Sequence, residues 1–352
     1  MKKAFIILKF SIVLLCLLTS CKKNDDDSLG QFEGGIYISN EGTFGLDDGS
    51  VTYYNTDLDT IYNSVFLNRN QRSPGDIVHS VAIYNRMAYI CAQNSGKIEI
   101  ADLKSFASLG TINNVDEVRY FIGCGNGNGY ATSWTGVGQI KVINLSNNSV
   151  ISSILLNRKG PDRMILNNDK VYVANSGGEG VDSTISVIST GTNEVIKTIY
   201  LDSYNPTGIV KDSTGNLWVL CKGKEYKQVG GPTPSKLIKI NLQTDEIKSS
   251  VELFADQHPM HLSISSDGQF LYYGGGYDFN GIYKINAASL TVPTSPLINR
   301  KCYSIGINYK NGDVFALESP SYTSLGKLYI YKSDGTFRKT FEVGKVPGNV
   351  IY

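Results

Sequence analysis

The sequence predicts an all-β protein, a seven-bladed β-propeller with four antiparallel strands per blade. Three observations predict it: a repeat of about 45 residues, one strand type that recurs seven times, and chain ends that complement each other. A unit of this length holds four short up-and-down strands, which together make one propeller blade. We therefore expect residues 36–352 to form one domain rather than two.

The recurring strand alternates β-branched or aromatic residues with others and is followed by a polar turn. A second strand precedes it in each unit, and a further strand opens the unit, often after a proline. The recurring strand is predicted at residues 51–54, 98–100, 140–143, 185–188, 237–240, 282–285 and 328–331. The opening positions are Val78, Val118, Pro161, Pro206, Pro259, Tyr303 and Pro347.

One interval between opening positions is longer than the others, from Pro206 to Pro259. The extra residues are predicted between Cys221 and Ser235, because the run Gly-Gly-Pro-Thr-Pro at 230–234 cannot be a regular strand. The interval therefore predicts an insertion in the fifth unit and not an additional blade.

The chain ends predict how the ring closes. The first unit begins at Ile36 without an opening strand, whereas residues 347–352 form an opening strand that no unit follows. A C-terminal strand that completes blade 1 would leave no free sheet edge between the first and last blades. Seven blades follow from this closure, with six or eight as the alternative counts.

Residues 1–20 are predicted to be a signal peptide. Lys2 and Lys3 precede an apolar run to Leu18 that is too short to span a bilayer as a mature segment. The ending Leu-Thr-Ser-Cys at 18–21 resembles a bacterial lipobox, which implies lipidation of Cys21; the alternative is a plain secretory signal with an incidental cysteine. Residues 21–35 are then a flexible tether, whose acidic run at 25–27 resembles the surface-export signal of Bacteroidetes lipoproteins. This resemblance implies an outer-membrane protein displayed at the cell surface.

Composition argues against several classes of function. The 33 Lys+Arg against 32 Asp+Glu leave a net charge of +1, which disfavours a nucleic-acid binder or an anionic-membrane binder, so the membrane would be reached through the lipid anchor only. The three histidines, and the absence of a Ser-nucleophile elbow or an H-E-x-x-H motif, argue against an enzyme. We expect no cofactor and no metal. The cysteines of the mature domain lie far apart without C-x-x-C spacing and are predicted to be buried core residues: Cys91, Cys124, Cys221 and Cys302.

The candidate binding surface is predicted from propeller geometry. Loops that enter the innermost strands share one face with the loops between the second and third strands, and this face binds ligands in most propellers. Aromatic residues lie in these loops among Asn, Gln, Ser and Gly, a mixture typical of recognition surfaces. The predicted ligand-binding residues are Phe44, His79, Asn94, Arg119, Trp134, Arg163, Asn175, Tyr226, His261, Tyr277, Phe279 and Tyr322.

Some of these residues belong to a predicted ring around the mouth of the central channel. Its cationic and imidazole groups would meet anionic or amide groups of a ligand, or would instead pair with Asp116, Glu117 or Asp162. The aromatic residues would contact the ligand or pack against neighbouring loops. The predicted ring contains His79, Arg119, Asp162, Arg163, Thr207, Met260, His261, Ser304 and Asn349.

Two resemblances refine the functional expectation. Residues 171–175 with 184–188 resemble YVTN-type repeats; residues 40–42 leading to 49–55, and 75–81 leading to 94–99, resemble a Bacteroidetes surface-propeller family. Its BtuG-type members are lipoproteins that bind cobalamin and pass it to a TonB-dependent outer-membrane transporter. The resemblance implies a bulky polar small-molecule nutrient as ligand, with cobalamin the best single guess.

Two alternatives remain open at the level of the sequence. The first is a propeller that binds glycans or other nutrients, and the second is a protein-interaction or adhesion propeller without a small-molecule ligand. A deep pocket at the channel mouth would favour a small molecule, whereas a flat face of more than about 800 Å² per partner would favour a protein.

Overall fold

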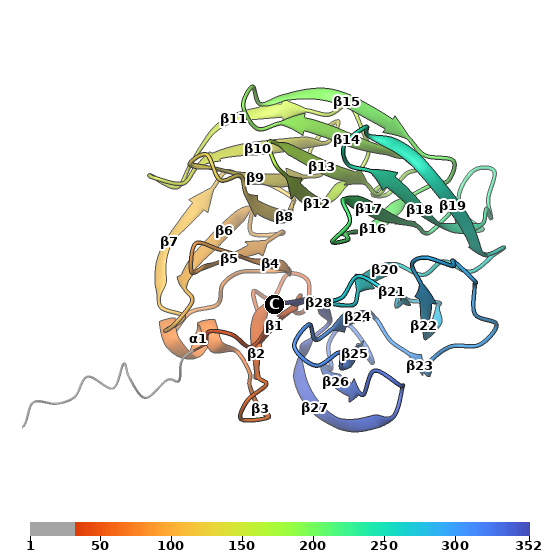
Figure 1. Cartoon of the computed structure of the whole chain (residues 1–352). Coiled ribbons are helices and arrows are strands. Elements are labelled where there is room, and N and C mark those ends of the chain that lie inside the picture. Colours follow the sequence, from red (N-terminus) through yellow and green to blue (C-terminus); the bar gives the residue numbers. More distant parts are fainter. Residues whose placement is uncertain (1–31) are drawn as a thin grey trace, which may run out of the picture.

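The computed structural model describes residues 32–352, which form seven four-stranded antiparallel sheets arranged around a central axis (Figure 1). The predicted fold class is confirmed. The predicted signal peptide (1–20), Cys21 and the larger part of the predicted tether (21–35) lie outside the described residues.

Each blade is named by its order in the ring, and its strands are given from the innermost to the outermost. Blade 1 contains β28 (Pro347–Ile351), β1 (Ile36–Asn40), β2 (Ser50–Asn55) and β3 (Thr60–Tyr62). Blade 2 contains β4 (Val78–Tyr84), β5 (Met87–Ala92), β6 (Lys97–Asp102) and β7 (Ser108–Asn113). Blade 3 contains β8 (Val118–Gly123), β9 (Asn128–Ser133), β10 (Gln139–Asn144) and β11 (Ser149–Leu155). Blade 4 contains β12 (Pro161–Asn167), β13 (Lys170–Asn175), β14 (Thr184–Ser189) and β15 (Glu194–Tyr200). Blade 5 contains β16 (Pro206–Lys211), β17 (Asn216–Cys221), β18 (Ser235–Asn241) and β19 (Glu246–Phe254). Blade 6 contains β20 (His261–Ile264), β21 (Phe270–Gly274), β22 (Asn280–Asn286) and β23 (Ile298–Lys301). Blade 7 contains β24 (Ser304–Ile307), β25 (Val314–Glu318), β26 (Leu325–Tyr331) and β27 (Phe337–Lys345).

The C-terminal strand closes the ring as the chain ends predict. β28 pairs antiparallel with β1, and Ser39 lies opposite Asn349 while Ile38 lies opposite Val350. The C-terminus accordingly lies near the centre of the ring, beside the first strand of the chain (Figure 1). Because the innermost strand of blade 1 comes from the other end of the chain, the first and last segments hold each other in one sheet.

The repeat positions agree with the strand boundaries. Five innermost strands begin at the predicted opening residues, and the other two begin at His261 and Ser304, within two residues of the predicted Pro259 and Tyr303. The fifth blade carries the predicted insertion as a loop over residues 222–234 between β17 and β18. The regular spacing of the strands is therefore interrupted where the sequence indicates.

The hydrophobic core is divided into clusters between neighbouring blades. One cluster joins Val187 of blade 4 to Val219 of blade 5, and another joins Ile38 of blade 1 to Leu317 of blade 7. The middle strands are therefore covered on both faces, as β17 illustrates with every residue buried. The four predicted core cysteines are all buried and unpaired; two lie in β5 and β17, and two lie directly beside strands.

A short helix that the sequence did not predict, α1 (Val65–Asn70), connects blade 1 to blade 2. Its first two residues, Val65 and Phe66, are buried in the core cluster that also contains Phe106. Six residues are too few to show helical periodicity, so the segment carries no helix signal. Over residues 32–352, no helix is both long enough and apolar enough to cross a membrane.

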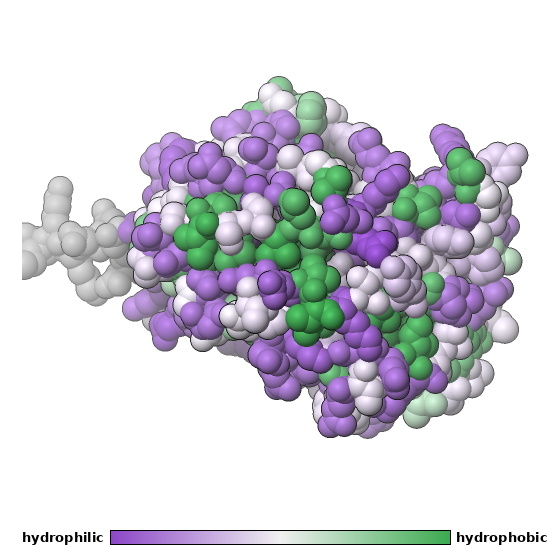
Figure 2. Space-filling model, turned by 90° about the horizontal axis from the view of Figure 1, so that it is seen from above, coloured by the Kyte–Doolittle hydropathy of each residue, from purple (hydrophilic) through white to green (hydrophobic). Residues whose placement is uncertain are grey.

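The rim of the ring carries apolar side chains over the outermost strands of blades 3 and 4. Apolar side chains gather across the middle of this rim in Figure 2, where β11 and β15 carry the exposed residues Ile151, Leu155 and Ile196. The exposed positions of these two strands also include polar residues, namely Ser152, Ser153, Glu194 and Lys197, and scattered apolar residues are normal on a protein surface.

Candidate functional site

A cavity of about 260 Å³ lies at the mouth of the central channel. The innermost strands begin here, because the loops that enter them share this face. Every residue of the predicted ring except Ser304 lines the cavity. The hydroxyl oxygen of Ser304 lies 3.3 Å from His261 Nδ1, at the edge of the same group of residues. The structure therefore brings together side chains from all seven blades, which are far apart in the sequence.

Arg119 lies on one wall of this cavity and has three neighbours. Its Nη1 donates a 2.7 Å hydrogen bond to Gln93 Oε1, and its guanidinium carbon lies 3.9 Å from the ring centroid of Trp134. Its Nε lies 3.7 Å from Asp162 Oδ1, an ion pair that is too long for a hydrogen bond. Asp162 was one of the predicted alternative partners of the ring, and it does form an ion pair with Arg119, although without a direct hydrogen bond.

Arg163 also lines the channel mouth. Its Nη2 donates a 2.5 Å hydrogen bond to Asn349 Oδ1 and lies 3.4 Å from His261 Nδ1. Its guanidinium carbon lies 4.9 Å from the ring centroid of Tyr120, whose hydroxyl also donates to Asn349 Oδ1. Blade 4 is thereby connected across the channel to the C-terminal strand.

The two histidines of the cavity are uncharged at neutral pH. Burial lowers the pKa of His79 well below its usual value, and the charges of Arg119 and Arg163 lower this pKa further. Burial, followed by the charge of Arg163, lowers the pKa of His261 to about 3. Apart from tyrosines, the other ionisable side chains in the cavity wall are the guanidinium groups of Arg119 and Arg163 and the carboxyl groups of Asp162 and Glu41.

A chain of hydrogen bonds connects the cavity with the outer surface. The Tyr277 hydroxyl donates a 3.1 Å hydrogen bond to the Tyr303 hydroxyl, which donates a 3.1 Å hydrogen bond to Glu41 Oε1. Burial raises the pKa of Glu41, although the Arg119 charge and the Tyr303 hydrogen bond act in the opposite direction. The Tyr277 hydroxyl proton is engaged in this chain, so its oxygen remains available as an acceptor.

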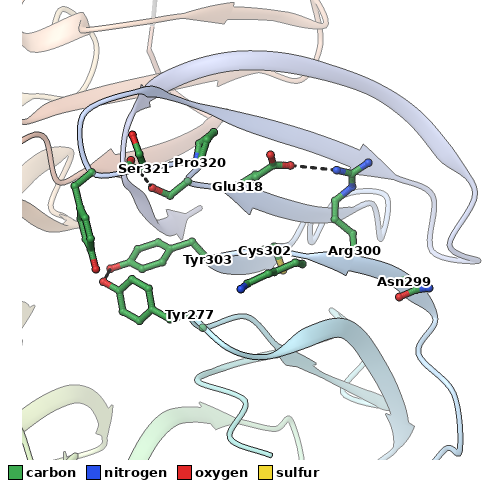
Figure 3. Close-up of a pocket in the computed structure, with 12 residues that line it drawn as sticks. Tyr277, Asn299, Arg300, Cys302, Tyr303, Glu318, Pro320 and Ser321 are labelled. Atoms are coloured by element: carbon green, nitrogen blue, oxygen red, sulfur yellow. Dashed lines mark hydrogen bonds and ion pairs between the residues drawn. The ribbon is translucent and has the colours of Figure 1, made fainter.

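Two larger cavities open on the same face. One of about 650 Å³ lies between blades 6 and 7, where Tyr277 and Tyr303 point toward each other at one end and Arg300 pairs with Glu318 at the other (Figure 3). Another, of about 480 Å³, lies beside the blade 5 insertion and includes Tyr226. Tyr277 lines these two cavities and the central one, so the three hollows meet at a single side chain.

The exposed aromatic residues of the prediction lie around this junction or on neighbouring loops. Tyr277 is 49% exposed, and the ring of Tyr322 lies 6.1 Å from it between centroids. Tyr226 and Phe44 project into solvent, and the loop of Phe44 reaches that of Tyr322 through a hydrogen bond from Thr43 Oγ1. Asn94 is exposed and donates a 2.5 Å hydrogen bond to Asp76 Oδ2.

Two predicted binding residues require correction, because their side chains are in the interior. Phe279 directly precedes β22, and its ring packs at 5.3 Å against that of Phe254 in the core of blade 6. Asn175 ends β13, and its Nδ2 donates hydrogen bonds to the hydroxyls of Thr184 and Ser186 at 2.9 and 3.0 Å. Loop position alone does not decide whether a side chain at a strand end points outward or into the blade.

Sequence reasoning omitted Glu41, Gln93, Tyr120 and Tyr303 from the candidate residues, although all four line the central cavity. Tyr303 occupies a predicted opening position, and Glu41 follows directly on the first strand, so their proximity to the channel had a sequence signal. Their mutual hydrogen bond had none, because they are separated by 262 positions. Within the described part of the chain, no group of three or more His, Cys, Asp or Glu side chains is placed to hold a metal ion.

Comparison with solved structures gives similarity of fold. A quinoprotein alcohol dehydrogenase-like protein from Bacteroides thetaiotaomicron is 16% identical with a TM-score of 0.67, over 92% of this chain and 79% of that one. A functionally unknown protein from Desulfotomaculum acetoxidans is 10% identical with a TM-score of 0.65, over 90% and 98%. Hydrazine synthase of Kuenenia stuttgartiensis is 13% identical with a TM-score of 0.54, over 71% and 74%. At these identities the similarity carries no information about activity.

Comparison with curated proteins found no match. One family model does match, and it covers residues 34–343, which is nearly all of the propeller. The chain therefore belongs to the family described as "Domain of unknown function (DUF5074)".

Proposed function

We propose that this protein is a cell-surface lipoprotein that binds a bulky polar small molecule, with cobalamin as the best single candidate. The ligand is then passed to a TonB-dependent outer-membrane transporter. The observation that carries the proposal is the junction at Tyr277, where three cavities of one propeller face meet.

The shape of the face supports a small-molecule ligand over a protein partner. Pockets for small molecules typically have volumes of about 300–1,000 Å³, a range that includes the two larger cavities of about 650 and 480 Å³. A ligand that occupies more than one of these hollows must be bulky and must contact Tyr277. A protein partner would instead use a broad flat surface, whereas this face is hollowed at its centre and on two sides.

The chemistry of the face supports a polar ligand without large net charge. Three tyrosine rings from separate loops, those of Tyr277, Tyr303 and Tyr322, offer apolar surface with hydroxyl groups at the edge. At the end of the 650 Å³ cavity away from Tyr277, the charges of Arg300 and Glu318 neutralise each other, with Arg300 Nη1 3.1 Å from Glu318 Oε2. A flat macrocycle rimmed with amides, such as the corrin of cobalamin, matches rings for stacking and polar groups at the rim.

We propose binding rather than catalysis. The two imidazoles in the central cavity have lowered pKa values, so neither is poised to exchange protons near neutral pH. The proposed lipid anchor at Cys21 and the acidic residues 25–27 would place such a binder at the cell surface, above a transporter in the same membrane.

The proposal is tested by calorimetric titration of the purified protein with cyanocobalamin. We expect saturable binding with a dissociation constant below about 1 μM, as a carrier that competes for a scarce nutrient requires. No heat of binding from a folded sample at micromolar concentration would overturn cobalamin as the ligand. A glycan-array signal that disappears in the Tyr277→Ala variant would replace cobalamin by a glycan at the same face.

A further inference from the structure

The wall of the central cavity contains polar atoms that have no partner within the protein. Four buried atoms neither donate nor accept a hydrogen bond, and their residues all line this cavity: His79 Nε2, Arg119 Nε, Asp162 Oδ1 and Thr207 Oγ1. Among residues 32–352, five further atoms of this kind lie in residues that do not line it. Buried polar groups are normally hydrogen-bonded, so four exceptions around one hollow indicate a partner from outside the chain.

Two of these atoms form a matched donor and acceptor. Arg119 Nε and Asp162 Oδ1 are 3.7 Å apart, which is too far for a direct hydrogen bond, and their side chains are only 16% and 12% exposed. Another nitrogen of the same guanidinium group, Nη1, donates a hydrogen bond to Gln93 Oε1, and this bond holds Arg119 in place. One wall of the cavity therefore has a fixed N–H donor next to a carboxylate acceptor, and neither is satisfied.

Ionisable groups of both signs surround the cavity. Arg119 is opposed by Asp162, both imidazoles are uncharged near neutral pH, and the carboxyl group of Glu41, whose pKa burial raises, accepts a hydrogen bond from Tyr303. An anionic ligand group would meet the two carboxyl groups, and a cationic group would meet the two guanidinium groups. The group that fits accepts one hydrogen bond, donates another and carries no charge. A primary carboxamide has this combination, with its C=O toward Arg119 and its N–H toward Asp162.

We infer that the central cavity is a subsite for one uncharged carboxamide group of the ligand. The inference rests on the proposed function, since it specifies the chemistry that the same face recognises. A volume of about 260 Å³ accommodates such a group and its linker, while the bulk of the ligand lies in the hollows lined by Tyr277. Because Asp162 Oδ1 is buried although Asp162 lines the cavity, contact of this oxygen with the ligand requires a rotation of the carboxyl group.

The experiment uses three probes of similar shape that differ in charge: propionamide, propionate and propylammonium. Each is titrated into the full-length mature protein labelled with ¹⁵N and ²H, and backbone amide shifts are followed around the cavity. We expect propionamide to shift the signals of Gln93 and Asn349, with an affinity at least five-fold higher than that of either charged probe. Equal or tighter binding of a charged probe, or the absence of any shift with propionamide, would overturn the inference.

A charge-removing variant separates recognition from a merely structural role. Asp162→Asn preserves the shape of the side chain and removes the negative charge, so the preference should change from propionamide toward propionate. Thr207→Val removes a hydroxyl isosterically and should weaken propionamide without changing the order of preference. The matched control is Asp334→Asn, the same substitution in the turn between β26 and β27 on the opposite face, which should retain the wild-type preference. An unchanged preference in a folded Asp162→Asn protein would contradict the inference.

The outcome is independent of the fate of cobalamin as a ligand. If cyanocobalamin does not bind but propionamide shows the expected preference, the subsite stands and its ligand is another carboxamide. If cyanocobalamin binds and the probes show no preference for the amide, the carboxamide subsite is refuted while the proposed function is supported.

Discussion

The guanidinium group of Arg163 donates a 2.5 Å hydrogen bond to the side-chain oxygen of Asn349, a residue 186 positions further along the chain. Arg163 belongs to blade 4, and Asn349 belongs to the strand that completes blade 1. The Asn349 amide group in turn donates a 2.7 Å hydrogen bond to the backbone carbonyl of His79 in blade 2. The C-terminal strand therefore closes the ring and also connects three blades across the channel.

Deleting residues 347–352 should strongly destabilise the protein. The deletion removes β28, exposes the edge of β1 and eliminates the hydrogen bonds of Asn349. Val350 and Ile351 are partly buried, so each contributes less than the about 1.5–3 kcal/mol of a fully buried side chain. Even so, the lost burial and the lost hydrogen bonds together make up a sizeable part of a typical free energy of unfolding of about 5–15 kcal/mol.

Thermal unfolding checks this prediction against a second truncation. Deleting residues 22–30 should leave the melting temperature unchanged, because this stretch is mainly Lys, Asn, Asp and Ser with little apolar surface to bury. A C-terminal deletion that melts like the intact protein would mean that the ring is held closed by other contacts.

Stability should fall on acidification below about pH 6.5 because of the two cavity histidines. Both have lowered pKa values in the folded protein, that of His261 being about 3, so between about pH 3 and 6.5 the unfolded chain binds more protons. Stability therefore rises with pH in this window, by up to about 1.4 kcal/mol per pH unit for each histidine. Urea unfolding at pH 7.5, 6 and 5 measures the slope, and His261→Gln should flatten it. An equally steep slope in the His261→Gln variant would show that His261 is not a source of the pH dependence.

Replacing Glu99 should expose the energetic role of a buried carboxylate between two cations. Burial alone would raise the pKa of Glu99, but hydrogen bonds from Arg72 and Lys97 outweigh burial and lower it. Glu99→Gln removes the charge that both cations contact and should cost about 2 kcal/mol, less than for a fully buried pair because Arg72 is 44% exposed. Denaturant unfolding measures the loss. The control Glu342→Gln, on an exposed position of β27, should change stability by less than about 0.5 kcal/mol.

The ring and the hydroxyl of Tyr277 should contribute differently to binding of the proposed ligand. Tyr277→Ala removes the shared wall of three cavities and should weaken cyanocobalamin binding at least ten-fold, or about 1.4 kcal/mol. Tyr277→Phe retains the ring and should have a smaller effect. Calorimetry measures both variants, with Tyr200→Ala as the control because that exposed tyrosine ends β15 on the rim. Wild-type affinity in Tyr277→Ala would place the ligand elsewhere.

Lipidation at Cys21 is tested directly in cells. Labelled palmitate should be incorporated into the wild-type protein and absent from the Cys21→Ser variant, since acylation requires the thiol. Surface display predicts that protease added to intact cells digests the protein. Palmitate incorporation into Cys21→Ser would refute the assignment of the modified residue, and full protection from protease would refute surface display.

The sequence by itself determined the number of blades, the start of most innermost strands, the insertion in blade 5 and the closure of the ring. These features follow from local information, because alternating β-branched and aromatic residues specify strands and turn residues specify their ends. Closure followed as well, since an unpaired strand at one end of the chain matched a missing strand at the other. The ring of residues at the channel mouth was predictable for the same reason, as it depends only on where each innermost strand begins.

The tertiary structure alone decided which loop side chains face the site. Phe279 and Asn175 occupy loop ends but point into the core and into a blade, where Phe254 and Thr184 are their partners. Tyr303 joins the site through Glu41, which comes from the other end of the chain. The direction of a loop side chain is decided by contacts between residues far apart in the sequence. Strand periodicity, in contrast, is a property of neighbouring residues, and this difference is the physical reason that the fold was predictable when much of the site was not.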